Sequence, residues 1–285
     1  MYPFLIDTHA HLHFPAYDAD REAVLERMRA KNIWSITIGT SLENSAQGVA
    51  FAKACPDVWA TVGLHPSHVT SSHLDEQEGS VHEHDVDPEK LKALAQSSTK
   101  VVAIGEAGLD FYRLDTHPNP DTARQEQERV FRVHLTVARE LDVPVVIHCR
   151  EGLTRLAEIT QEMWNEGWKP RAIVHSFTGT WREARPLVDL GLMIAVNGIA
   201  TFPLRKGQDP ESTIDRTIEH IPFAQLLLET DAPYLAPALY RGKRNEPMYV
   251  EEVAKHVARV RGVSLEEAAR HTTENAINIF RLPTA

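Results

Sequence analysis

A chain of 285 residues is long for an average domain but ordinary for a single α/β barrel, and it is long enough to bury a large core. Its 42% hydrophobic and 25% charged residues are typical of soluble globular proteins. The net charge of −10 argues against a protein that coats nucleic acid through a wide basic face. It does not exclude an enzyme whose bound divalent ions create a local positive site.

The two cysteines, Cys55 and Cys149, are too few and too far apart in the sequence to indicate a disulfide framework, which favours a reducing compartment. The first 13 residues contain neither the basic nor the apolar segment of a signal peptide, and no stretch has the length of a membrane span. We therefore expect one cytoplasmic domain over residues 1–285, without a membrane segment or an obligate protein partner.

Short apolar runs alternate with amphipathic helical patterns along the chain. Strands are predicted at residues 4–11, 33–39, 58–64, from 101 to a turn at Glu106, and at 144–148, 172–175, 192–196 and 226–231. Helices are predicted at 19–31, 42–54, 88–97, 122–141, 151–164, 181–190, 211–220, 246–260 and 264–280, the last interrupted near Thr272. Eight strands alternating with helices favour a TIM-type (β/α)8 barrel over an open sheet.

Residues at about 67–87 break this alternation with a polar, acidic and histidine-containing segment. A segment of this kind is typical of a long surface insertion between a strand and its helix. Its histidines lie among acidic residues with no regular element to fix them, which favours a solvated loop over a metal site.

Six side chains with metal-binding chemistry fall at the carboxyl ends of predicted strands. In a parallel α/β fold these ends meet at one mouth, where active sites form. A single histidine at such a position is more often structural, but burying six ionisable groups without mutual compensation would be costly. The six residues are His9, His11, Glu106, His148, His175 and Asp231.

Imidazole and carboxylate ligands together suit zinc or manganese, and a carboxylate-rich half accepts magnesium. We assign one divalent ion to His9, His11 and Asp231 and a second to His148 and His175, with Glu106 bridging the two. Two ions about 3.5–4 Å apart would activate a bridging hydroxide and stabilise the attacking and leaving oxygens of a displacement.

Seven short motifs contain these residues or lie between them. They are DTHAHL at 7–12, GLHP at 63–66, IGEAGLD at 104–110, IHCR at 147–150, HSFTG at 175–179, ETDAPYL at 229–235 and RGKRNEP at 241–247. In this order they resemble the motifs of the TatD family of metal-dependent deoxyribonucleases. The resemblance covers almost the whole chain. Two features depart from the family pattern: the long 67–87 segment, and Ala107 where a larger aliphatic residue is common.

The resemblance implies an amidohydrolase-like barrel with a two-metal site on the ligands assigned above. It also implies hydrolysis of DNA phosphodiester bonds, often as a 3′–5′ exonuclease on single strands or 3′ ends. In barrel hydrolases of this kind the carboxylate of the last strand accepts a proton from the attacking water, so Asp231 is expected to be catalytic as well as a ligand. Glu106, as the bridging carboxylate, is the second expected catalytic residue.

Substrate-binding residues are predicted around the same motifs. Each has an alternative: His65 as a capping residue, Arg150 as the partner of a helix carboxylate, and the basic run as a solvated loop. We expect these side chains to hold phosphates rather than read bases. The predicted residues are His65, Arg150, Arg241, Lys243, Arg244 and Asn245.

Two other functions remain open at this point. The same ligands polarise a carbonyl as readily as a phosphoryl group, so a binuclear amidohydrolase or lactonase is one alternative. A bridging carboxylated lysine is common among those relatives, whereas Glu106 takes the comparable role here, which favours the nuclease. The other alternative is a metal-stabilised partner protein without turnover, although the sequence shows no lost ligand.

Overall fold

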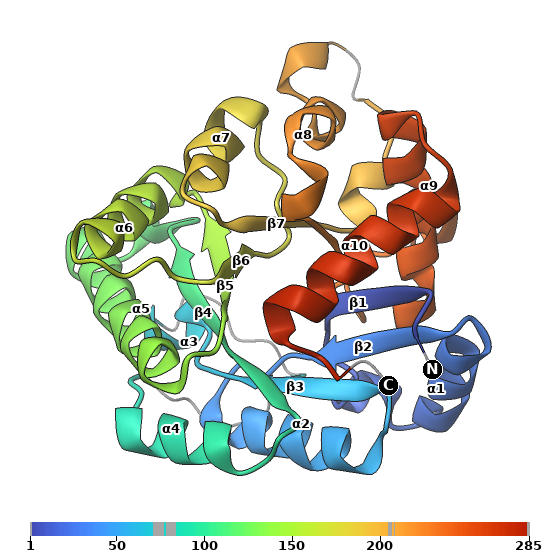
Figure 1. Cartoon of the computed structure of the whole chain (residues 1–285). Helices are drawn as coiled ribbons and strands as arrows, with labels where there is room; N and C mark the ends of the chain where they lie inside the picture. The colour runs from blue at the N-terminus through green and yellow to red at the C-terminus, as the bar shows by residue number, and fades with distance from the viewer. Residues whose placement is uncertain (1, 71–76, 78–83, 205–206, 208, 284–285) are drawn as a thin grey trace. The chain divides into compact units, whose positions relative to one another are not determined.

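The structure is a computed structural model that describes residues 2–70, 77, 84–204, 207 and 209–283. Within these residues, eight strands form one sheet in the order β1-β2-β3-β4-β5-β6-β7-β8 (Figure 1). The pairs β3–β4, β4–β5, β5–β6 and β7–β8 are parallel. Strands in chain order with helices between them form the TIM-type (β/α)8 fold, so the predicted fold class is confirmed.

The strands are β1 (Leu5–Ala10), β2 (Ile33–Thr37), β3 (Val58–Val62), β4 (Val101–Asp110), β5 (Val145–Arg150), β6 (Ala172–Val174), β7 (Met193–Val196) and β8 (Leu226–Leu228). The helices are α1 (Arg21–Ala30), α2 (Leu42–Ala54), α3 (Pro66–Thr70), α4 (Pro88–Gln96), α5 (Pro120–Leu141), α6 (Leu153–Asn165), α7 (Trp181–Asp189), α8 (Ile214–His220), α9 (Val250–Arg261) and α10 (Leu265–Phe280). None of these helices is both long and apolar enough to span a bilayer.

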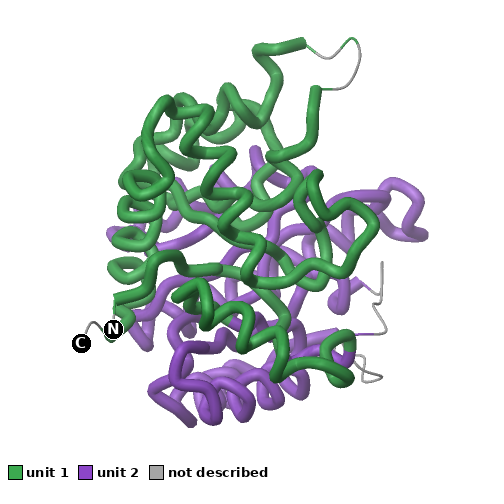
Figure 2. Tube along the Cα trace, turned by 90° about the vertical axis from the view of Figure 1, so that its right-hand side faces the viewer, with its two compact units in different colours: residues 1–12, 16–36, 175–285 green, residues 13–15, 37–174 purple. Residues whose placement is uncertain are grey.

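The chain divides into two compact units, which Figure 2 colours separately. Unit 1 contains residues 1–12, 16–36 and 175–285, and unit 2 contains residues 13–15 and 37–174. The expectation of one domain over the whole chain stays a prediction.

In unit 1, β1 is buried along its whole length, and α10 packs beside it (Figure 1). Helix α10 begins after Ser264, whose side chain accepts a hydrogen bond from the Glu267 backbone N–H. The predicted interruption near Thr272 is wrong because the helix is continuous. The Thr272 hydroxyl donates to the Ala268 carbonyl at 2.9 Å, so the helix satisfies this polar group internally.

In unit 2, β4 corrects the prediction that the chain turns at Glu106. The strand continues to Asp110, and its register with β5 shifts between Ile104 and Ala107. Gly105 and Gly108 have φ values of 135° and 151°, and a Cβ on either would meet a carbonyl oxygen of β5 at 2.4 or 2.0 Å. The two glycines therefore let the strand bend closely past β5 without ending, and Glu106 lies in the middle of a strand.

Of the predicted insertion at about 67–87, the structure describes residues 67–70, 77 and 84–87. Helix α3 covers its first residues, and Asp87 caps α4 by accepting hydrogen bonds from the backbone N–H groups of Glu89 and Lys90. Residues 71–76 and 78–83 lie outside the described residues. The surface-loop prediction for that stretch stays a prediction.

Candidate metal centre

The predicted ligands form clusters of donor atoms within each unit. In unit 1, His9, His175 and Asp231 place one ligand atom each within 4.8 Å of one another. In unit 2, His65, Glu106 and His148 do the same. His65 was predicted as a substrate-binding residue, and the structure places it beside two predicted metal ligands.

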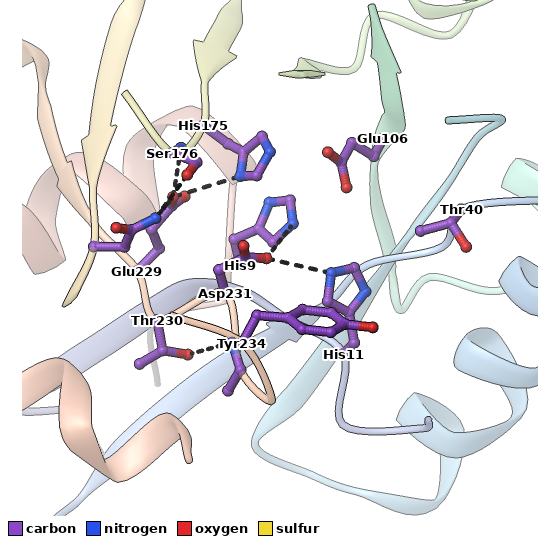
Figure 3. A network of polar contacts seen from close by, with 12 residues as sticks. His9, His11, Thr40, Glu106, His175, Ser176, Glu229, Thr230, Asp231 and Tyr234 are labelled. Carbon is purple, nitrogen blue, oxygen red and sulfur yellow. Dashed lines mark hydrogen bonds and ion pairs between the residues drawn. The ribbon is translucent and has the colours of Figure 1, made fainter. Parts of the chain in front are cut away.

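The unit 1 cluster is built on β1, on His175 directly after β6, and on the segment after β8 (Figure 3). His9 and His11, two residues apart, both approach Asp231: its Oδ1 lies 3.6 Å from His9 Nε2 and 3.4 Å from His11 Nε2. The His175 ring stacks on the His9 ring, with the centroids 3.9 Å apart. His9 lies in β1 and His11 directly follows it, and residues at i and i+2 along an extended chain share a face, which explains why the two histidines converge.

Asp231 is the only carboxylate in the unit 1 donor cluster described above. Burial alone would raise its pKa, but His11, His9 and His175 hold the pKa of this carboxyl below its ordinary value. Its side chain is 14% exposed, and its backbone N–H donates to the His9 carbonyl at 2.8 Å. Asp231 is therefore an ionised carboxylate fixed against β1.

The unit 2 cluster surrounds His148 with two carboxylates. Glu106 Oε1 lies 3.0 Å from His148 Nδ1, and Asp110 Oδ2 lies 3.1 Å from His148 Nε2. His65 Nε2 is 3.5 Å from the same Glu106 oxygen. Burial raises the pKa of Asp110, but His148 and His65 outweigh it, so the net shift of this pKa is downward.

Two buried carboxylates that the sequence reasoning missed support the unit 1 cluster. Asp7 accepts hydrogen bonds from the Thr230 backbone N–H at 2.8 Å and from its hydroxyl at 2.6 Å. Burial raises the pKa of Asp7 well above its ordinary value. Glu229 accepts from the Ser176 N–H at 2.6 Å and lies 3.5 Å from His175 Nδ1 (Figure 3).

The sequence did contain signals for these carboxylates and for Asp110. Asp7 precedes His9 by two residues within β1, so strand alternation places this pair on one face. Glu229 precedes Asp231 by two residues within the strand predicted at 226–231, so the same rule predicts a shared face there, although β8 itself ends at Leu228. Asp110 follows Glu106 at an even spacing, but a predicted turn at Glu106 hid that relation.

Two predicted substrate-binding residues are engaged inside unit 1. Both Arg244 terminal nitrogens donate to Asp20, at 2.8 and 2.7 Å, and one also donates to the Ala16 carbonyl at 2.7 Å. Asn245 is fully buried, and its amide donates to the Thr230 and Tyr234 carbonyls at 2.8 and 2.6 Å. These contacts engage both side chains inside unit 1, and the predicted phosphate contact of each residue stays a prediction.

The other cationic candidates remain at the surface. Arg150 is exposed, and its guanidinium lies 3.5 Å from the centroid of the Tyr112 ring. Arg241 and Lys243 are also exposed, on the loop after β8. None of these positions contradicts a phosphate contact, which stays a prediction for each.

The donor sets in both units fit divalent cations. Imidazole nitrogens and carboxylate oxygens converge in buried clusters, and the Asp231 carboxylate is ionised, as a metal ligand must be. Asp7 and Glu229 lie behind the unit 1 residues, as carboxylates behind metal ligands commonly do.

Comparisons with known proteins agree with this chemistry. The uncharacterized metal-dependent hydrolase YabD of Bacillus subtilis is 34% identical, covering 98% of this chain and 99% of its own. The 3′-5′ ssDNA/RNA exonuclease TatD of Pectobacterium carotovorum is 34% identical, covering 98% and 100%. The crystal structure of YJJV, a TatD homolog from Escherichia coli, superposes with a TM-score of 0.82 at 30% identity, covering 99% and 100%.

The family described as TatD related DNase matches residues 6–281, which include both donor clusters. The match covers nearly the whole chain and agrees with the relatives and with the fold. The chain therefore belongs to the TatD family of metal-dependent hydrolases.

Proposed function

We propose that the protein is a metal-dependent 3′–5′ exonuclease that hydrolyses phosphodiester bonds of single-stranded DNA. The observation that carries the proposal is the ionised Asp231 carboxylate beside three imidazoles within a TatD family chain. The similarity to the Pectobacterium relative, a 3′-5′ ssDNA/RNA exonuclease, supports the substrate class and the polarity.

In this proposal His9, His11 and Asp231 hold one divalent ion, His148 and His175 hold a second, and Glu106 is shared. Bound Mg²⁺, Mn²⁺ or Zn²⁺ would lower the pKa of water and neutralise charge on the phosphate. Glu229 and Asp110 are positioning residues, since they lie 3.5 Å from His175 Nδ1 and 3.1 Å from His148 Nε2 respectively.

The protein's own groups then have distinct tasks. Asp231 accepts the proton of the attacking water, because its lowered pKa keeps it ionised at neutral pH. His65, beside Glu106, donates a hydrogen bond to a substrate phosphate oxygen. The exposed Arg150, Arg241 and Lys243 hold the nucleic-acid backbone and do not distinguish bases.

The test is hydrolysis of single-stranded DNA labelled at either end, with chelator, Mg²⁺ or Mn²⁺. We expect stepwise shortening from the 3′ end that requires metal. Asp231→Asn and Glu106→Gln should lower kcat by about 10²–10⁴-fold, the usual contribution of a positioned proton acceptor or an electrostatic group. The matched control is Asp189→Asn, which removes an exposed carboxylate on α7.

Metal content and thermal unfolding of each variant separate lost chemistry from lost structure. Metal-loaded wild type that cleaves no DNA would overturn the proposal, and hydrolysis of lactones or cyclic amides by the same sample would favour the carbonyl-hydrolase alternative. An RNA oligonucleotide of the same sequence determines whether the activity extends to both nucleic acids.

A further inference from the structure

In unit 1, the loop that follows β7 packs closely against the loop that follows β8. They contain the short helices η4 (Gly198–Thr201) and η7 (Ala238–Tyr240). A Cβ on Gly198 would lie 2.2 Å from the Leu235 carbonyl oxygen. The backbones of the two loops therefore approach each other so closely that only glycine fits at position 198. The Thr201 hydroxyl accepts a hydrogen bond from the Ala238 N–H at 2.8 Å.

The joined loops expose apolar side chains, which is unusual for this protein. Among the described residues only three large hydrophobic side chains are exposed, and two of them belong to these loops: Leu204 at 56% and Leu239 at 71%. The third, Tyr2, lies near the N-terminus. Exposed apolar groups gathered on loops near a site indicate a binding surface more often than isolated ones do.

Cations accompany aromatic rings on the same loops. The Arg241 guanidinium lies 5.5 Å from the Phe202 ring centroid, and the Lys243 ammonium lies 6.0 Å from that of Tyr240. The Tyr240 ring is itself stacked on Tyr249, with centroids 3.8 Å apart and the planes 12° from parallel. We call this surface the loop platform; it consists of Phe202, Leu204, Leu239, Tyr240, Arg241 and Lys243.

The chemistry of the loop platform matches a single-stranded nucleic acid. Aromatic and apolar groups stack on bases of any sequence, while arginine and lysine contact the phosphates between them. A protein partner would favour a surface whose centre lacks charge, whereas here the cations lie over the rings. The chain as a whole has a net charge of −10, so a polyanion would bind where cations such as Arg241 and Lys243 are exposed.

The platform loop is also connected to the unit 1 cluster. It begins directly after Asp231, and the Tyr234 ring lies 6.0 Å from the ring of His11 in an edge-to-face arrangement. The Asn245 N–H donates to the Pro233 carbonyl at 3.0 Å, which returns the loop to its starting point. A nucleic-acid strand whose 3′ end reaches Asp231 would therefore lie at the start of the loop that carries Leu239, Tyr240, Arg241 and Lys243 of the loop platform.

We propose that the loop platform binds the nucleotides on the 5′ side of the scissile bond, so that it sets the enzyme's preference for longer strands. This inference rests on the proposed exonuclease function. For an enzyme that removes the 3′ nucleotide, the remaining strand extends in the 5′ direction, and the platform supplies stacking and charge for it.

The experiment compares kcat/KM for a dodecanucleotide with kcat/KM for a dinucleotide. We expect the ratio of the two to fall about tenfold or more in Leu239→Ser and in Arg241→Gln/Lys243→Gln, because each removes contacts to the longer strand. The charge variant should also lose part of the salt dependence of dodecanucleotide hydrolysis. The matched control is Arg182→Gln/Arg185→Gln, which removes two exposed cations of α7 and should leave the ratio unchanged.

An unchanged ratio in the platform variants would overturn the inference, and so would equal losses on both substrates, which would indicate a local structural defect. Fluorescence anisotropy measures binding of the dodecanucleotide to the Asp231→Asn protein, with and without the platform substitutions. This measurement separates the proposed exonuclease activity from the proposed strand binding by the loop platform. If wild type cleaves neither substrate, the exonuclease proposal fails; binding that the platform substitutions abolish would still support the surface. Vesicle binding or self-association lost in these variants while DNA binding persists would overturn it.

Discussion

At the scale of single residues, His134 shows how a buried imidazole fixes a site loop. It lies on α5 in unit 2 and is completely buried. Its Nε2 accepts the Leu64 backbone N–H at 3.0 Å, and its Nδ1 lies 2.8 Å from the Val130 carbonyl, to which it donates. Only the neutral ring makes both bonds, and it thereby holds the residue that precedes His65.

Protonation of His134 should therefore destabilise the fold. Burial lowers its pKa from 6.5 to about 4, so between these pH values the unfolded chain binds a proton that the folded chain does not. With respect to His134, the free energy of unfolding is highest above pH 6.5, where the ring is neutral in both states. It decreases as the pH falls towards 4, by up to about 3 kcal/mol. Urea unfolding across this range should show a shallower pH dependence for His134→Gln, which does not titrate. Equal dependence in both proteins would contradict the assignment.

Single residues also show what the sequence could predict. Strand alternation is enough to place His9 and His11 on one face, and the same rule would have found Asp7. It could not find the Arg244–Asp20 pair, because the two residues are separated by 224 positions and meet only through the fold. A basic run in a sequence therefore does not distinguish a phosphate ligand from an internal ion pair.

At the scale of elements, the junction between η4 and η7 depends on the missing side chain of Gly198. Gly198→Ala should push the Leu235 carbonyl away and lower the free energy of unfolding by about 1–3 kcal/mol, the usual cost of overpacking. Thermal unfolding measures this change. Thr201→Ser keeps the hydroxyl that accepts the Ala238 N–H and should behave like wild type; an alanine at 198 without cost would show that the loops adjust freely.

Helices α5 and α6 are joined by an ion-pair network centred on Glu128. Its carboxylate accepts from Arg155 at 2.7 and 2.8 Å and from Arg132 at 2.8 Å, and these guanidinium groups lower its pKa to about 2. The groups are 23–33% exposed, so solvent screening limits Glu128→Gln to a loss of about 1 kcal/mol or less. Because the folded pKa is depressed, the stabilisation is present above pH 4.5 and is lost towards pH 2. Chemical unfolding of wild type and Glu128→Gln at neutral and acidic pH, with and without added salt, measures this loss and its pH dependence.

Element boundaries were predictable where local signals were strong and not where tertiary packing decided them. Helix α2 begins and ends at its predicted residues, with Ser41 capping its start. The glycines of β4 predict a turn when the sequence is considered alone, because a sequence does not show that another strand passes within contact distance. The place of Glu106 in the middle of β4 is therefore determined by the neighbouring strand β5 and not by local sequence propensity.

At the scale of the whole molecule, bound divalent ions should stabilise the native state. Ions that bind the folded chain and not the unfolded one add about 2.7 kcal/mol at a concentration one hundred times Kd. Calorimetry should show a lower Tm after chelation and a recovery with Mn²⁺. Asp231→Asn should reduce this recovery, whereas Asp189→Asn should not; a Tm that is independent of metal in wild type would contradict a resident ion.

Whole-chain quantities carried less information about function than the order of the motifs. The alternation of strands and helices was sufficient for the fold class, and the seven motifs were sufficient for the family. The net charge could not predict the exposed cations of the loop platform, because a sum over 285 residues does not show where the charges lie. Only the packing of two loops shows that they share a surface with exposed leucines.

The hydrogen bonds of Asn245 have a consequence for substitutions in the loop after β8. Its side chain and backbone fasten both ends of the loop after β8, through Thr230, Pro233 and Tyr234. The stem that fixes Asp231 is thus held by hydrogen bonds of its own, whereas the tip at residues 238–243 is held by a different contact, from the Ala238 N–H to the Thr201 hydroxyl. Because the two sets of contacts differ, we expect substitutions in the tip to change the proposed strand binding while Asp231 keeps its place beside His9 and His11.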